Sequence, residues 1–281
     1  MPSKTLNYDL VNAQPVVLRP FSTIEFWMVG CGGTGSFLVR LLCRLMQSLI
    51  QQGKECKLVL IDPDTVEVKN LTRQCFCTAE VGLNKAHALA ARYSTAWNLP
   101  IQACAEAFDP TTLSRHYNKL IILFGCVDNA QARTYLAKAL EFNHSQSPRI
   151  WWIDGGNGDR FGQVLVGSSL DPRPETYSAS ELGWIWLPAP SVQAPDLLIA
   201  KPEEVTTVPL SCAEQTLLNI QGLMVNPQVA ILMADVAQDL LKGTLKRFAV
   251  LFDQTTGTMQ SRYTTQEAIR AALNRCNRTE T

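Results

Sequence analysis

The sequence predicts an α/β fold: a Rossmann-like, largely parallel sheet with flanking helices, continued by antiparallel strands and a crossover loop. Three observations lead to this prediction. Short apolar runs alternate with helix-like segments in the first half of the chain. A glycine-rich turn joins the first apolar run to the first helix. After residue 150 the apolar runs follow each other closely, as antiparallel strands do.

The first half of the chain is expected to form a parallel sheet. Its elements are predicted as strands at residues 25–29, 57–61, 101–105 and 120–124, and helices at 36–47, 85–93 and 130–140. Strands that alternate with helices favour parallel pairing, and such sheets bind ligands at the carboxyl ends of their strands.

The second half is expected to differ. Its predicted elements are strands at 150–153 and 162–166, a long proline-rich irregular connection at 170–209, a helix near Cys212, a helix from Asn226 to Gly243, a hairpin at 247–253 and 259–263, and a helix at 266–275. Asn226 and Pro227 form a good N-cap and first-turn pair, and Gly243 can end that helix.

Composition excludes several classes of protein. The 281 residues carry 25 Lys and Arg against 25 Asp and Glu, so binding to a nucleic-acid backbone is not expected. No apolar run is long enough for a signal peptide or a membrane span, which predicts a cytoplasmic protein without membrane contact. The nine Cys include no C-x-x-C pair, which favours reduced thiols and no zinc site.

The glycine turn predicts a nucleotide site. Gly30, Gly32, Gly33 and Gly35 follow a strand and enter a helix, where backbone amides can approach a phosphate. Asp62, at the end of the second strand, could hold ribose hydroxyls, as it would in an NAD-binding fold.

A set of polar residues distinguishes the kinds of nucleotide site. It consists of Asp62, Asp64, Asn70, Arg73, Gln74, Lys85, Asp128 and Asn129. Carboxylates near strand ends suit Mg²⁺ held partly by phosphate and water, and Arg and Lys suit a polyphosphate, whereas a redox site needs neither. The alternative is that Arg73 and Lys85 are solvated charges paired with Asp64 or Glu67.

These residues occur in the order glycine turn, D-x-D, N-L-x-R-Q, G-x-x-K and D-N, and in this the chain resembles the ThiF/MoeB/HesA superfamily of enzymes that activate ubiquitin-like proteins. The resemblance spans residues 24–166 firmly and the remainder loosely. The segments 29–36 and 209–214 look most like ThiF-type proteins of the PRTRC plasmid cassette.

The resemblance implies ATP- and Mg²⁺-dependent adenylation of the C-terminal glycine carboxylate of a small ubiquitin-like (β-grasp) protein, with release of pyrophosphate. It implies that Asp62 holds the ribose and that Asn70, Arg73, Gln74 and Lys85 bind the phosphates. Arg73 and Lys85 would be catalytic, because they offset the charge that builds on the α-phosphate and the departing pyrophosphate. Asp128, with Asp64 as the weaker candidate, would place Mg²⁺. Residues 1–169 would form the adenylation core, 170–210 the crossover loop and 211–281 the remainder of the same domain.

The resemblance also raises questions about two further residues and about partners. Cys212 is a candidate catalytic nucleophile that forms a thioester, with a small buried hydrophobe as the alternative. Arg19 is the only arginine near the place where relatives carry one that reaches the partner subunit's ATP. A homodimer and a separate conjugating enzyme are further partners that the family implies.

Three alternatives stay open at this point. The carboxylate could belong to a sulfur carrier, a peptide or a modified tRNA. The glycine turn and Asp62 by themselves would also fit an NAD-dependent oxidoreductase. A nucleotide-binding subunit without catalysis is the third.

Overall fold

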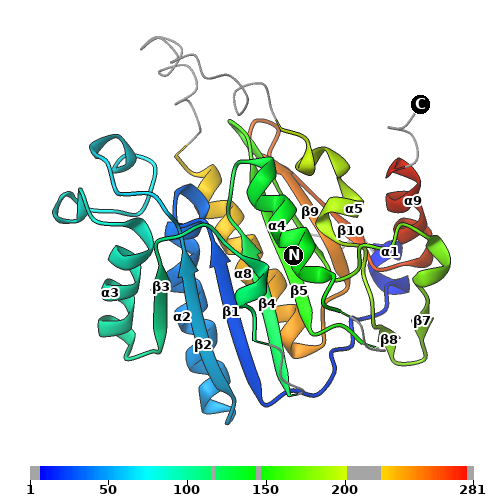
Figure 1. Cartoon of the computed structure of the whole chain (residues 1–281). Coiled ribbons are helices and arrows are strands. Elements are labelled where there is room, and N and C mark those ends of the chain that lie inside the picture. The colour runs from blue at the N-terminus through cyan, green and yellow to red at the C-terminus, as the bar shows by residue number, and fades with distance from the viewer. Residues whose placement is uncertain (1–6, 115–117, 144–146, 201–222, 277–281) are drawn as a thin grey trace, which may run out of the picture.

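The computed structural model describes residues 7–114, 118–143, 147–200 and 223–276 (Figure 1). Eight strands form one sheet in the order β10-β9-β6-β5-β4-β1-β2-β3, and β7 pairs with β8 in a two-stranded sheet. The strands are β1 (Thr23–Val29), β2 (Glu55–Ile61), β3 (Ile101–Cys104), β4 (Lys119–Gly125), β5 (Ile150–Asn157), β6 (Phe161–Gly167), β7 (Ala179–Ser180), β8 (Gly183–Trp184), β9 (Arg247–Asp253) and β10 (Thr258–Tyr263).

Five strands, β1 to β5, pair in parallel, and the sheet continues through β6, β9 and β10 in antiparallel pairing. The predicted fold class, a largely parallel sheet continued by antiparallel strands, is therefore confirmed. The helices are α1 (Tyr8–Asn12), α2 (Gly33–Gln51), α3 (Lys85–Trp97), α4 (Ala130–Leu140), α5 (Pro190–Gln193), α8 (Val225–Lys242) and α9 (Gln266–Cys276).

Helices cover both faces of the sheet. Figure 1 shows α4 in front of the sheet and α2 and α8 behind it. On α2 the apolar side chains of Leu38, Leu42, Met46 and Leu49 recur every three or four residues and are buried. Each such side chain contributes about 1.5–3 kcal/mol by leaving water, so this stripe fixes α2, and with it the glycine turn, against the sheet.

Two helices differ from the predicted bounds at their amino ends. Helix α2 begins at Gly33, inside the glycine turn, instead of at residue 36. The prediction that Asn226 caps α8 is wrong: Met224 is the N-cap residue, and Asn226 lies within the first turn with its side chain buried. Helix α8 does end at Gly243, which has φ of 67° as a left-handed C-cap requires.

The proline-rich connection is described up to residue 200 and contains only short elements: β7, β8, α5 and the 3₁₀ turns η4 (Pro174–Thr176) and η5 (Pro195–Leu198). It is nonetheless packed, since Trp184 is buried and its indole Nε1 donates to Thr264 O at 2.9 Å. Trp184 therefore belongs to the core. The predicted helix near Cys212 lies outside the described residues. No helix in the described ranges combines the length and the hydropathy that crossing a membrane requires.

Candidate functional site

The site lies where the strand order reverses. Val29, the last residue of β1, is level with Ile61 of β2 on one side and with Gly125 of β4 on the other. The next residue along each strand meets its neighbour there: Gly30 N donates to Ile61 O at 2.9 Å, and Cys126 N donates to Val29 O at 2.8 Å. Open parallel sheets bind ligands at such a switch point.

The glycine turn is closed too tightly for side chains at two positions. Gly30 has φ of 93°, and a Cβ there would lie 2.4 Å from Cys126 O. A Cβ on Gly35 would lie 2.0 Å from Gly30 O. The helix that follows has Gly32 as its N-cap, and no side chain caps it. The first amides of α2 are therefore left to an outside acceptor, which makes an anion site.

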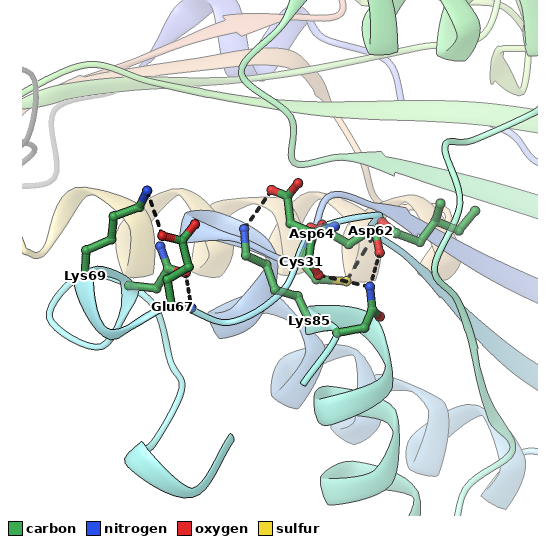
Figure 2. Close-up of polar contacts among 9 residues, drawn as sticks. Cys31, Asp62, Asp64, Glu67, Lys69 and Lys85 are labelled. Atoms are coloured by element: carbon green, nitrogen blue, oxygen red, sulfur yellow. Dashed lines mark hydrogen bonds and ion pairs between the residues drawn. The ribbon is translucent and has the colours of Figure 1, made fainter. Parts of the chain in front are cut away.

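Asp62 holds this turn from the next strand. Its Oδ2 accepts from Cys31 N at 2.6 Å, and its Oδ1 accepts from Asp64 N at 2.9 Å (Figure 2). Burial raises the pKa of Asp62, while these two hydrogen bonds oppose the rise. Because both oxygens accept from backbone amides, the carboxylate is needed to shape the turn whatever else it binds.

Lys85 begins α3 and reaches back to the same strand end. Its Nζ lies 2.9 Å from Asp64 Oδ2, and its side chain is 9% exposed against 64% for Asp64 (Figure 2). Asn84 caps the helix and donates to the Asp62 and Asp64 carbonyl oxygens. The expected alternative pairing with Asp64 thus occurs, but Lys85 is a buried cation rather than a solvated one.

The segment of Asn70, Arg73 and Gln74 folds into one compact turn. Asn70 is buried, its Oδ1 accepts from Glu67 N at 2.8 Å, and its carbonyl oxygen accepts from Gln74 N at 2.8 Å. Gln74 Oε1 is buried and has no hydrogen-bond partner in the described part of the chain. Gln74 lies against Gly32, since its Nε2 is 3.6 Å from where a Cβ of that residue would be.

Arg73 has no ion-pair or hydrogen-bond partner for its guanidinium among the described residues. Glu67, its other expected partner, pairs with Lys69 at 2.9 Å instead (Figure 2). Gln74, with its unsatisfied amide oxygen, lies beside the uncapped end of α2, and Arg73 precedes it in the same turn; a bound polyphosphate and its hydrated cation would satisfy such groups. The residues present therefore fit ATP.

A partly buried arginine holds this turn to α3. Arg92 on α3 donates to Glu80 Oε1 and to Cys75 O, each at 2.9 Å, and its guanidinium lies 5.5 Å from the Tyr93 ring centroid. Burial would raise the pKa of Glu80, but the hydrogen bonds from Arg92 and from Cys77 N outweigh it and the pKa lies below its usual value. The ion pair connects the segment carrying Gln74 to α3.

Asp128 and Asn129 follow β4. The Asn129 side chain caps α4 by accepting from Ala132 N at 2.8 Å, so its oxygen is already engaged by the protein. Asp128 is exposed and lines a cavity of about 710 Å³. Within the described ranges no three His, Cys, Asp or Glu side chains gather as a metal site would require. Asp128 or Asp64 could hold Mg²⁺ only with phosphate and water as further ligands.

Sequence reasoning missed two groups that border this cavity. Arg133, one turn into α4, forms a buried ion pair with Asp154 of β5. Asn157 donates to Thr34 Oγ1 at 3.5 Å and to Asn226 Oδ1, connecting the cavity wall to the first turn of α2. The spacing of four from Asn129 to Arg133 was the available signal, because it places Arg133 over the capped end of α4.

The remaining candidates are placed as follows. Cys31 is buried and Cys126 is partly buried, and burial raises the pKa of both thiols, so both serve as packing residues. Arg19 precedes β1 and lines a second cavity with Lys54 and Lys242, at the end of the sheet opposite to the glycine turn. Cys212 lies outside the described residues.

Comparison with known proteins extends these findings. The sequence profile of the ThiF family matches residues 18–268. Among curated relatives, the SUMO-activating enzyme subunit uba-2 of Caenorhabditis elegans is 29% identical over 148 residues, 50% of this chain and 22% of the relative. Ubiquitin-like modifier-activating enzyme 5 of Dictyostelium discoideum is 30% identical over 144 residues, 46% of this chain and 34% of the relative. The chain thus spans about a third of these relatives or less.

Solved structures share the fold. E. coli MccB, crystallised with AMPCPP and MccA, superposes with a TM-score of 0.52 at 16% identity over 92% of this chain and 65% of MccB. PaaA superposes with a TM-score of 0.52 at 16% identity over 85% of this chain and 63% of PaaA.

Proposed function

Because this chain belongs to the ThiF family, we propose that it uses ATP and Mg²⁺ to adenylate the C-terminal carboxylate of a ubiquitin-like protein or a peptide. The observation that carries the proposal is the uncapped amino end of α2, with the buried Lys85 paired to Asp64 nearby and Gln74 against Gly32, preceded by Arg73, which has no partner among the described residues. The relatives named as activating enzymes for SUMO and for a ubiquitin-like modifier support the substrate class, and a structure of MccB with ATP supports the nucleotide.

In the proposed reaction a carboxylate oxygen attacks the α-phosphorus of ATP. A new P–O bond forms, the bond from the α-phosphorus to the bridging oxygen breaks, and pyrophosphate leaves with that electron pair. The carboxylate is ionised at neutral pH, so no base is needed. What opposes the step is repulsion between two anions, together with the charge that builds on the leaving group.

The residues of the site are suited to that problem. The amides of the glycine turn and the positive end of α2 face the phosphates. Arg73 and Lys85 offset the charge that moves to pyrophosphate, and Asp62 holds the turn while remaining available to ribose hydroxyls. Mg²⁺ held near Asp128, with Asp64 as the second candidate, would neutralise phosphate charge.

Isothermal titration with Mg·AMPCPP, followed by ATP–pyrophosphate exchange with a pool of octapeptides ending in Gly-Gly, tests the proposal. Arg73→Met and Lys85→Met should each lower exchange by about 10²-fold or more, the loss seen when one transition-state charge partner is removed. Lys69→Met is the matched control, because Lys69 lies in the same loop, is solvated and pairs only with Glu67 among the described residues.

The outcomes separate the alternatives. Binding of NADH without binding of Mg·AMPCPP would overturn the proposal in favour of an oxidoreductase. Exchange that is unchanged in the Arg73 and Lys85 variants would remove their assigned roles. Nucleotide binding without exchange would exclude short peptides, and the same assay is then run with folded ubiquitin-like proteins.

Several finer parts belong to the proposal. Under it, residues 1–169 form the adenylation core, 170–210 the crossover loop, and 211–281 carry Cys212, which would receive the activated carboxylate as a thioester. Arg19 could serve only the site of a second protomer, because in its own protomer it lies at the opposite end of the sheet. A cross-linking experiment with Arg19 replaced by a photoreactive residue tests the homodimer directly.

A further inference from the structure

Arg133 and Asp154 form a buried ion pair beside the nucleotide site. Arg133 Nε lies 3.3 Å from each Asp154 oxygen, and the two side chains are 8% and 0% exposed. Asp154 is level with Gly125, the last residue of β4, so the pair lies at the carboxyl end of β4, next to the switch point. Burial raises the pKa of Asp154, and the charge of Arg133 opposes that rise.

The pair uses only part of the guanidinium. An arginine has five N–H donors, and four of them are on the two Nη atoms. In the described part of the chain only the Nε of Arg133 has a side-chain acceptor. Arg133 also lines the 710 Å³ cavity together with Asp128 and Asn157. A charged side chain that is nine-tenths buried therefore lines a cavity that adjoins the nucleotide site, and its two Nη groups have no side-chain acceptor among the described residues.

The shape of the cavity indicates what it admits. On its sheet wall, Gln163 of β6, Leu251 of β9 and Gln260 of β10 are in register, so the wall runs across three strands away from Arg133. The wall has room for several residues of an extended peptide, since neighbouring strands lie about 4.8 Å apart.

The charges indicate which end of that peptide reaches Arg133. Among the described residues that line the cavity, Arg133 is the one cation, and the carboxylates of Asp128 and Asp196 border it. A single planar carboxylate can accept two parallel N–H bonds from a guanidinium.

We infer that Arg133 binds the carboxylate of the substrate through its two Nη groups, next to Asp128, and that Asp154 holds the guanidinium in that position. The inference rests on the proposed function. Each carboxylate oxygen accepts one N–H bond and keeps a lone pair, so the bound group can still attack phosphorus. Arg133 thereby offsets the repulsion between the carboxylate and the nucleotide and sets the direction of approach.

The test compares two fluorescein-labelled pools of octapeptides ending in Gly-Gly, one with a free carboxylate and one with a C-terminal amide. Their binding to the full chain with Mg·AMPCPP is measured by anisotropy. The wild type should bind the free-acid pool about tenfold or more tightly than the amide pool, because a charge-assisted pair is replaced by neutral contacts.

Three variants complete the experiment. Arg133→Met should abolish the preference for the acid, and Arg133→Lys should retain part of it. Because Arg133→Met leaves Asp154 buried without a cation and so destabilises the fold, the double variant Arg133→Met/Asp154→Leu is tested as well, with thermal unfolding as the folding check. Arg247→Met is the matched control, because Arg247 begins β9, does not line the cavity and pairs with Asp235 and Asp239 of α8.

Two results overturn the inference. The first is a wild type that does not prefer the acid pool, which includes a wild type that binds neither pool. The second is a folded Arg133→Met variant that keeps the preference for the acid pool. Failure of the proposed function looks different. In that case ATP–pyrophosphate exchange is absent while the preference for the acid still depends on Arg133.

Discussion

Replacing Asp62 with asparagine tests how the glycine turn is held. The carboxylate accepts from Cys31 N with one oxygen and from Asp64 N with the other. Asparagine has one acceptor oxygen, so one of these amides would face an NH₂ group. One hydrogen bond to a charged group is lost and a buried donor is left unpaired, which together lower the free energy of unfolding by about 2–4 kcal/mol.

The assay is urea unfolding followed by tryptophan fluorescence, without nucleotide, so that ligand binding cannot contribute. Asp64→Asn is the control. Its carboxylate is largely exposed, and the asparagine oxygen can still accept from Lys85, so the expected loss is below about 1 kcal/mol. If Asp62→Asn and Asp64→Asn lose the same free energy, Asp62 does not hold the turn and its burial has another purpose.

Two further predictions concern the same region. Gly35→Ala should lower the midpoint of thermal unfolding strongly, because its Cβ would lie 2.0 Å from the backbone oxygen of Gly30. Gly32→Ala should be tolerated, because the nearest atom to its Cβ is 3.6 Å away. Equal unfolding midpoints for the two variants would contradict this prediction. Glu80→Gln should lower the free energy of unfolding at pH 7 by about 1 kcal/mol or more by weakening the bond to Arg92. The pKa of Glu80 in the folded protein is lowered from 4.5, so the stability that its ionised form contributes is present above pH 4.5 and is lost as the pH falls. The difference in free energy of unfolding between wild type and Glu80→Gln should therefore shrink between pH 5 and pH 3. A constant difference would refute the role of the ion pair with Arg92.

Local patterns in the sequence were sufficient to predict most of the fold. Apolar runs and helical spacing predicted the strands that became β1 to β6, β9 and β10, because each reflects the burial of one segment and depends on residues close together in the chain. Helix bounds were less accurate where a cap is not provided by a side chain. Asn226 illustrates this: its oxygen accepts from Thr34 Oγ1 at 3.3 Å instead of capping its own helix.

The candidate site was predicted in the same local way. The glycine turn, Asp62, Lys85 and Asp128 follow strand ends or begin helices, and parallel strands bring such positions to one edge. The sequence contains no signal for how each side chain is engaged there. Asn129 is used by the cap of α4, while Arg73 is left unpaired among the described residues.

By itself, then, the sequence determined the order of strands and helices and the glycine turn with its polar residues, since each of these is specified within a few residues of chain. Only the tertiary structure decided that Arg133 meets Asp154, that Thr34 meets Asn226, and that Arg19 lies at the opposite end of the sheet. These relations join segments up to 192 residues apart, and they are set by how helices pack on the sheet, which no short stretch of sequence encodes.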